Sequence, residues 1–277
     1  MQRRLSHVGP RIARVIVAAA LGVGLAAPSG AALAADAFST AWAPGAKSQA
    51  RLIAADQRLA GFEIKLAPGA ITYWRNPGDS GLPPSFDFSG SDNVMSVEPI
   101  FPAPKRMVEA DGGEAFGYDG GVIFPLRVTP RDVAKPVTLA LDAQFAVCEK
   151  ICLPARARLK LTLPADAPSP YAAQIEAALA AAPRAVNLRD FGAIAPAGAD
   201  AWRLCAPAQV GPPRALFVEA PEGWWVKVTA DPGEPGKDCF HLTLQDKPKG
   251  AAPPVALRLT LTGGAGPIET TLDAPAL

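Results

Sequence analysis

Two cysteines separated by three residues are the side chains of this sequence best suited to chemistry. Cys148 and Cys152 lie in the stretch FAVCEKICLPARARL, between two segments that are both typical of β-strands. On one extended strand their Cα atoms would be about 13 Å apart, at ~3.3 Å per residue. A disulfide requires less than about 7 Å. The chain must therefore reverse within CEKIC, which places the two cysteines on opposite arms of a tight hairpin.

Comparison with the two other cysteines favours a redox role for this hairpin. Cys205 and Cys239 lie in strand-like segments and would close a much larger ring. The chain-entropy model assigns about 2 kcal/mol to a ring of about five residues and about 4 kcal/mol to one of about 35. We therefore predict that Cys205–Cys239 is a structural disulfide and that the small, constrained Cys148–Cys152 ring is redox-active. A second structural bridge is the alternative.

The N-terminal 35 residues have the features of a cleaved signal peptide. Four arginines precede a small and apolar run over 15–27, and Ala32 and Ala34 form the small-x-small pattern of a cleavage site. The run is shorter than the ~20 apolar residues that span a bilayer, so we favour cleavage over the alternative of a retained anchor. We predict export to the periplasm, an oxidising compartment in which cysteines are mostly paired.

Other chemistries have little support in the sequence. Beyond the leader there is one histidine, His241, in a strand-like segment, and no G-x-S-x-G motif accompanies it. No phosphate-binding glycine motif is present. Without its leader the chain has 23 basic and 26 acidic residues, a net charge of −3, and it lacks the basic clusters of nucleic-acid-binding proteins. Hydrolase, nucleotide-binding and nucleic-acid-binding functions are therefore excluded.

Two functional alternatives to redox exchange remain open. Thiolates are suitable ligands for Cu(I), so reduced Cys148 and Cys152 could hold one ion. Met95 and Met107 form no methionine-rich tract to support metal delivery, and we predict no metal or other cofactor beyond this alternative. The second alternative is a non-redox sandwich that binds a protein partner, for which the Cys148–Cys152 bridge would be inert.

Strand-like segments in two blocks must position these cysteines. Alternating or β-rich runs, separated by Pro and Gly turns, occur at 48–55, 60–69, 121–130, 136–147 and 157–165, and again at 201–207, 214–222, 223–233, 238–246, 255–264 and 268–275. Such spacing predicts an all-β protein with two β-sandwich domains, about 36–165 and 166–277. One large sandwich is the alternative.

A single helix is predicted between the two blocks, in SPYAAQIEAALAAAP. Ser169 is a suitable N-cap, Pro170 suits the first helical position, and Pro183 ends the helix. The two sandwiches are therefore expected to be joined by a short helical linker.

The motifs around the cysteine hairpin resemble a known family. CEKICLPA follows a strand and is preceded by YWRNPGDSGLPPSFDFSGSDNV, FPAPKR and GYDGGVIFPLRV. This series of motifs, over roughly 45–165, resembles the periplasmic N-terminal domain of DsbD-type thiol:disulfide interchange proteins, and most of all their ScsB-type copper-sensitivity relatives. The second block resembles the trailing sandwich of the ScsB-type extracytoplasmic region.

The resemblance implies an immunoglobulin-like fold and an electron-relay function. Cys148 and Cys152 would be the redox pair, one forming a mixed disulfide with a partner and the other resolving it. The donor would be a membrane-embedded conduit or a thioredoxin-like protein, and the acceptors would be periplasmic thiol oxidoreductases. Family members usually carry the conduit and a thioredoxin-like domain on the same chain. These 277 residues contain neither and no C-x-x-C motif, so we expect a component of a protein-disulfide reductase system that uses separate partners.

The resemblance also implies a cap loop that covers the cysteines. The segment 111–121, DGGEAFGYDGG, occupies the matching position. Phe116 or Tyr118 would be the aromatic shield, Glu114 would lie near the thiols, and the flanking glycines would let the loop move. An ordinary glycine-rich hairpin turn with a core aromatic is the alternative.

The floor of the site is assigned to two adjacent aromatic residues by the same resemblance. Tyr73 and Trp74, in ITYWRNP, would lie beneath the cysteine pair. The alternative is that both simply belong to the hydrophobic core.

Overall fold

The computed structural model describes residues 36–277 except 80, 110–111 and 166–167. The predicted signal peptide lies outside the described residues. The described residues belong to one compact unit. Neither helix within the described part of the chain has the length and apolar character needed to cross a bilayer.

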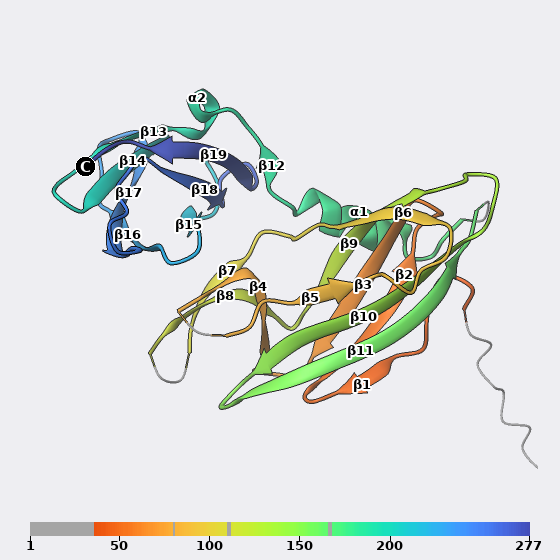
Figure 1. Ribbon diagram of the computed structural model, residues 1–277. Coiled ribbons are helices and arrows are strands. Elements are labelled where there is room, and N and C mark those ends of the chain that lie inside the picture. Colours follow the sequence, from red (N-terminus) through yellow and green to blue (C-terminus); the bar gives the residue numbers. More distant parts are fainter. Residues whose placement is uncertain (1–35, 80, 110–111, 166–167) are drawn as a thin grey trace, which may run out of the picture. The chain divides into compact units, whose positions relative to one another are not determined.

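The N-terminal half consists of two antiparallel sheets (Figure 1). The strands of one sheet alternate along the sequence with groups of strands of the other. One sheet contains, in spatial order, β1 (Ala43–Gly45), β2 (Ser48–Ala54), β3 (Leu59–Leu66), β9 (Gly121–Pro130) and β6 (Val94–Pro99). The other contains β11 (Cys152–Leu163), β10 (Val137–Cys148), β4 (Ile71–Gly78), β8 (Glu114–Asp119) and β7 (Lys105–Val108), with β5 (Ser85–Asp87) paired to β10.

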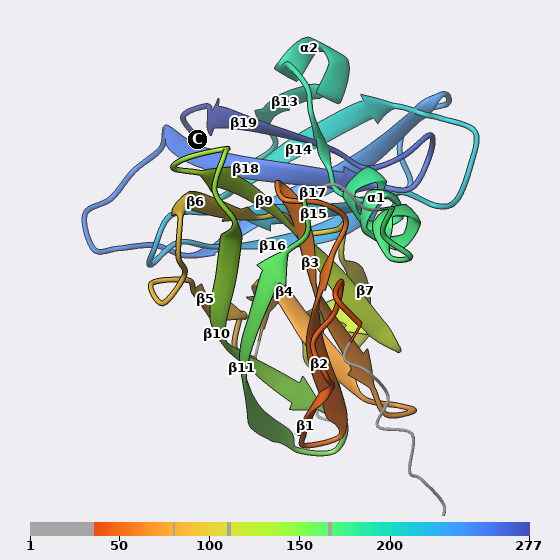
Figure 2. The ribbon, with the colours of Figure 1, turned by 90° about the vertical axis from the view of Figure 1, so that its right-hand side faces the viewer.

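These two sheets share one hydrophobic core. Phe62 and Leu126 of the first sheet and Leu139 and Leu161 of the second belong to the same buried cluster. In β11 and over 137–145 of β10 the buried residues alternate with exposed or half-buried ones, as expected for strands with one face on the core, whereas the last four residues of β10 are all buried. Burial of each large apolar side chain contributes ~1.5–3 kcal/mol. The core therefore holds the long β10–β11 ribbon, visible in Figures 1 and 2, in a defined register.

The C-terminal half begins with α1 (Ala172–Ala180) and also contains a short helix, α2 (Leu188–Phe191). One of its sheets contains β12 (Arg184–Ala185), β19 (Ile268–Ala274), β18 (Val255–Thr262) and β15 (Ala215–Glu219). The other contains β13 (Ala193–Pro196), β14 (Ala201–Pro207), β17 (Lys237–Asp246) and β16 (Trp225–Asp231). The β12–β19 pairing is parallel, whereas the other strand pairs of this half are antiparallel.

The predicted mostly-β architecture is confirmed, with a short helix between the two halves. Every strand-like run named from the sequence overlaps a strand of the structure. No sheet of the described residues combines strands from both sides of α1; the domain limits at 165 and 166 stay a prediction.

The start of the helix differs from the prediction. The N-cap residue is Tyr171 instead of Ser169. The Ser169 hydroxyl accepts a hydrogen bond from the Tyr171 backbone N–H (3.0 Å) and also contacts the carbonyl oxygen of Ala54. Because the Ser169 hydroxyl binds a carbonyl group of a neighbouring strand, the helix begins two residues further along the chain.

Candidate redox site

The two cysteines of the hairpin form a disulfide at the end of the β10–β11 ribbon. Cys148 is the last residue of β10 and Cys152 the first of β11, and the two are directly opposite in the strand register. Their Cα atoms are 4.1 Å apart. The ladder continues without a shift to Val137 and Leu163. The predicted chain reversal and the pairing of these cysteines are thus confirmed; the redox role is considered below.

The two cysteines differ in their accessibility. Cys148 is 4% exposed and packs in a small cluster with Tyr73, Ala115 and Ala146. Cys152, by contrast, is exposed. Cys152 is therefore the more accessible cysteine of the disulfide.

Tyr73 of β4 contacts both sulfur atoms. Its hydroxyl oxygen lies 2.8 Å from Cys148 Sγ and 3.2 Å from Cys152 Sγ. Strand β4 is adjacent to β10, with Ile71 opposite Cys148, so the ladder places the tyrosine two residues from that pair. Gly81 packs against the tyrosine ring, where any Cβ would collide with ring carbons, and has a φ of +108°. Glycine is thus required where the chain covers this ring.

Glu109 completes the group of polar atoms at the disulfide. The Tyr73 hydroxyl donates a hydrogen bond to Glu109 Oε1 (2.7 Å). A carboxylate oxygen of Glu109 and the two sulfur atoms all lie within 4.8 Å of one another. Glu109 follows β7 in the turn to β8, where its backbone N–H donates to the Gly113 carbonyl oxygen (2.8 Å). The sequence analysis missed this residue, which lies two positions before the predicted cap segment 111–121; an acidic residue so close to that segment was the available signal.

Among the described residues, the Tyr73 hydroxyl has three neighbouring acceptors for its one hydrogen. A charged carboxylate is a stronger acceptor than a disulfide sulfur, so in the oxidised protein the hydrogen points to Glu109. If Cys148 becomes a thiolate, the hydroxyl can turn its hydrogen to that sulfur, 2.8 Å away. The arrangement can therefore stabilise a negative charge that forms on Cys148.

The residues predicted for the cap loop lie in a strand pair. The predicted loop 111–121 contains β8, which pairs with β7. Phe116 packs edge-on against Phe217, with ring centroids 5.0 Å apart, and Glu114 forms an ion pair with Arg106 (2.5 Å). The roles of Phe116 as a shield and of Glu114 near the thiols stay predictions.

The other two aromatic residues of the prediction, Tyr118 and Trp74, are both buried in the main core cluster. The Tyr118 hydroxyl donates to the Pro102 carbonyl oxygen (2.8 Å), and burial raises the pKa of Tyr118 well above its ordinary value. Trp74 belongs to the main core cluster and contacts Phe217. Of the two residues predicted for the floor, the structure brings Tyr73 to the sulfur atoms.

Three basic residues near the hairpin, Lys47, Arg156 and Arg158, are paired with acids. Arg156 and Arg158 of β11 both bind Asp142 of β10, and these contacts lower the pKa of Asp142 to about 2. At the turn itself, Lys47 forms an ion pair with Glu149. These ion pairs join neighbouring segments at the ribbon. Among the described residues, the polar groups placed at the two sulfurs are the Tyr73 hydroxyl and the Glu109 carboxylate.

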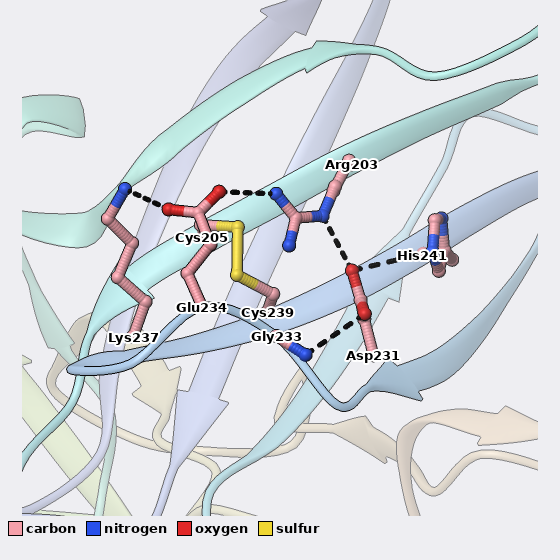
Figure 3. The surroundings of a disulfide bond; sticks show 8 residues. All are labelled: Arg203, Cys205, Asp231, Gly233, Glu234, Lys237, Cys239 and His241. Carbon is pink, nitrogen blue, oxygen red and sulfur yellow. Dashed lines mark hydrogen bonds and ion pairs between the residues drawn. A yellow bond between two sulfur atoms is a disulfide. The ribbon is translucent and has the colours of Figure 1, made fainter.

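A second disulfide joins two adjacent strands of the C-terminal half (Figure 3). Cys205 of β14 and Cys239 of β17 are directly opposite in the register. Beside it lies a network of ion pairs, which includes contacts of 2.5 Å from Arg203 to Asp231 and 2.6 Å from Lys237 to Glu234. Hydrogen bonding from the Arg203 guanidinium lowers the pKa of Asp231. The pairing agrees with the sequence prediction, and its structural role stays a prediction.

Comparison with known proteins identifies the class of the N-terminal half. Residues 41–164 match the family described as "Thiol:disulfide interchange protein DsbD, N-terminal". This part of the chain, which carries the disulfide, Tyr73 and Glu109, belongs to the DsbD N-terminal domain family. No curated protein matches the chain significantly.

The fold is similar to that of one solved structure over most of the chain. The N-terminal periplasmic domain of ScsB from Proteus mirabilis is 20% identical, with a TM-score of 0.67, over 87% of this chain and 99% of the other. At this identity the likeness concerns the fold alone. A structure of manganese lipoxygenase of Gaeumannomyces graminis with part of zonadhesin of Komagataella pastoris is 11% identical, covers 82% and 87% of the two chains, and has a TM-score of 0.17, too low to support an inference.

Proposed function

We propose that this chain is a periplasmic thiol:disulfide exchange protein that relays electrons through Cys148 and Cys152. The observation that carries the proposal is an accessible disulfide at a hairpin tip of a DsbD N-terminal domain, with a tyrosine hydroxyl against both sulfurs. A membrane-embedded conduit or a thioredoxin-like protein would reduce the pair. The reduced pair would then reduce periplasmic thiol oxidoreductases.

The difference in exposure supports one order of the exchange steps. A thiolate of the donor attacks Cys152 Sγ, because Cys148 is buried. The S–S bond breaks as the mixed disulfide forms, and Cys148 leaves as a thiolate beside the Tyr73 hydroxyl. The second thiolate of the donor then displaces Cys152. Two electrons pass to this chain, both cysteines acquire protons from water, and the donor becomes oxidised.

Transfer to the acceptor is the same sequence in reverse. The Cys152 thiolate attacks the disulfide of the acceptor, and Cys148 then attacks Cys152 to release the reduced acceptor. The Glu109 carboxylate, within 4.8 Å of both sulfurs, disfavours thiolates electrostatically. The Tyr73 hydrogen bond opposes this effect at Cys148.

The finer features of the chain are proposed on the same basis. We assign to the N-terminal half the immunoglobulin-like fold that the family resemblance implies, and to residues 1–35 the role of a cleaved signal peptide. The fold similarity to a periplasmic domain supports localisation in the periplasm. Cys205–Cys239 is proposed as a structural bridge of the second domain.

The cysteine that contacts the partner can be identified with single-cysteine variants of the hairpin. The Cys148→Ser protein is converted to its Cys152–thionitrobenzoate mixed disulfide and offered to a reduced thioredoxin that lacks its resolving cysteine. Thioredoxin should displace thionitrobenzoate and form a covalent adduct through Cys152. The matched Cys152→Ser protein, activated at Cys148, should react much more slowly. Equal rates, faster reaction at Cys148, or no adduct in either protein would contradict the proposed exchange.

Copper binding is a second candidate, because Glu109 and the two cysteines place three donor atoms within 4.8 Å. After reduction the two thiolates would be suitable ligands for Cu(I). The reduced protein is titrated with Cu(I) in competition with a chromophoric chelator. Tight one-to-one binding that requires both cysteines would favour this function; binding no stronger than that of a double Cys→Ser variant would exclude it.

A further inference from the structure

We propose that Arg106 and Phe217 are positioning residues that hold the β7–β8 hairpin, and with it Glu109, over the redox disulfide. Phe217 lies on β15 in the C-terminal half, so this inference assigns that half a part in controlling the disulfide. It rests on the proposed function, since it explains how the reactivity of that same site is limited. It concerns residues that lack any contact with the reacting sulfurs.

Phe217 is a point of contact between β15 and the sheet that carries the site. It is 1% exposed and belongs to the core cluster of the N-terminal half. Its ring meets Phe116 of β8 edge-on, with centroids 5.0 Å apart, and Trp74 of β4 with centroids 5.9 Å apart. Edge-to-face aromatic pairs contribute beyond the area that they bury. One side chain therefore contacts both the strand that carries Tyr73 and its neighbour β8.

Arg106 connects the hairpin to β15 by polar contacts. Its Nη2 donates to the Leu216 carbonyl oxygen (3.0 Å), and its Nη1 binds Glu114 Oε2 across the hairpin (2.5 Å). The guanidinium also lies over the rings of Phe116 (5.1 Å) and Phe217 (5.6 Å). An arginine side chain with this geometry contacts both hairpin strands and β15 at the same time.

Strand β4 is bound to the same part of the C-terminal half. Arg75 donates to both carboxylate oxygens of Glu219 at 3.0 Å, and the Asn76 amide donates to the Val218 carbonyl oxygen (2.8 Å). These residues follow directly after Tyr73 and Trp74. Contacts with β15 thus hold the strand of Tyr73 as well as the hairpin of Glu109.

Glu109, which lies beside the disulfide, is close in the hairpin to the anchored residue Arg106. Arg106 is paired with Phe116 in the β7–β8 register, and Glu109 is three residues further along the same strand and turn. The Glu109 carboxylate lies within 4.8 Å of both sulfurs. An attacking thiolate is negatively charged and must approach this carboxylate, so the anchored hairpin slows the exchange. Release of the hairpin would move the charge away from the sulfurs.

The test compares two arginine substitutions in the full chain. Arg106→Gln removes the contacts to Leu216 and Glu114. Arg127→Gln is the matched control, since Arg127 is paired with Glu98 (2.8 Å) on another sheet. The rate of disulfide reduction by dithiothreitol is followed by alkylation and peptide mass analysis. We expect the redox disulfide to be reduced about tenfold faster in Arg106→Gln, which is the rate change that corresponds to the loss of one charge-assisted hydrogen bond. The rate in the control should not change.

The C-terminal disulfide and a double variant distinguish positioning from loss of stability. Reduction of Cys205–Cys239 in the same samples should stay at the wild-type rate. Glu109→Gln should also accelerate reduction. Adding Arg106→Gln to it should have little further effect, because the arginine acts by holding the Glu109 charge near the sulfurs. Phe217→Leu, which keeps an apolar side chain, should resemble Arg106→Gln.

Three outcomes would overturn the inference. The first is that Arg106→Gln leaves the rate of Cys148–Cys152 reduction unchanged or lowers it, which includes the case in which no variant is reduced faster than the wild type. The second is that Arg106→Gln accelerates the reduction of both disulfides equally. The third is that the effects of Arg106→Gln and Glu109→Gln on this rate are fully additive. A small dithiol is the only reductant in these measurements. Failure of thioredoxin to form an adduct would therefore refute the proposed function without deciding this inference.

Discussion

Two substitutions at the disulfide should shift the pKa of Cys148 in opposite directions. In the reduced protein, Tyr73→Phe removes a hydroxyl that lies 2.8 Å from Cys148 Sγ. A hydrogen bond to a charged group is worth ~1.5–3 kcal/mol, and one pKa unit corresponds to ~1.4 kcal/mol. We therefore expect the pKa of Cys148 to rise by about 1 to 2 units. Phenylalanine keeps the ring that packs against Gly81.

Glu109→Gln should lower the same pKa. Its carboxylate lies within 4.8 Å of the sulfur. At that separation, Coulomb's law gives a repulsion of about 0.9 kcal/mol for an effective dielectric of ~80 and about 3.5 kcal/mol for ~20. Removal of the charge should therefore lower the pKa of Cys148 by about 0.6 to 2.5 units. The amide keeps the shape of the side chain and its ability to accept the tyrosine hydrogen bond.

These shifts can be measured by NMR titration of 13C-labelled cysteine in a Cys152→Ser background. Tyr118→Phe is the matched control, since the Tyr118 hydroxyl is buried and donates to a backbone carbonyl instead of a sulfur. It should leave the pKa of Cys148 unchanged. A shift below about 0.3 units in Tyr73→Phe, or shifts of the same sign in both site variants, would refute the assignment of these two residues.

Three further predictions concern the second disulfide, the β10–β11 ribbon and the β4–β8 pairing. Replacing both Cys205 and Cys239 by alanine should lower the free energy of unfolding by about 4 kcal/mol in urea denaturation; a loss below about 1 kcal/mol would argue against a structural bridge. The carboxyl group of Asp142 should titrate at about pH 2 in 13C NMR, so its contribution to stability is complete above about pH 4 and lost as the pH falls toward 2; a midpoint near 3.9 would show that the Arg156 contact is absent in solution. Gly117→Ala should weaken the β4–β8 pairing, since a Cβ there collides with the backbone of β4, and faster amide exchange in β8 would report it; unchanged exchange would contradict this.

The cysteine hairpin and most strands could be predicted because the relevant constraints are local. The distance along an extended strand alone requires that the chain reverse between Cys148 and Cys152. Alternation of apolar and polar residues is likewise a property of each strand, and it located β14, β17, β18 and β19 in their observed positions. The pairing of Cys205 with Cys239 followed from the same strand assignments once the small ring had been recognised.

The remainder of the site depends on contacts between distant segments. Alternation puts Tyr73 and Trp74 on opposite faces of β4, but only the sheet order decides which face meets the sulfurs. Glu109 reaches the tyrosine because β7 and β8 pair, and a sequence that reads as a glycine-rich loop conceals that pairing. Phe116 contacts Phe217, which is 101 residues away in the sequence.

The most direct test of the account is the reduction potential of each disulfide in the same molecule. The oxidised protein is equilibrated with graded ratios of reduced and oxidised dithiothreitol, and alkylated cysteines are counted at each pair by mass analysis. We predict that Cys148–Cys152 is half-reduced above about −300 mV and that Cys205–Cys239 is half-reduced below this value, as in structural disulfides. Reduction of Cys205–Cys239 first, or both midpoints below about −300 mV, would contradict a relay through Cys148 and Cys152.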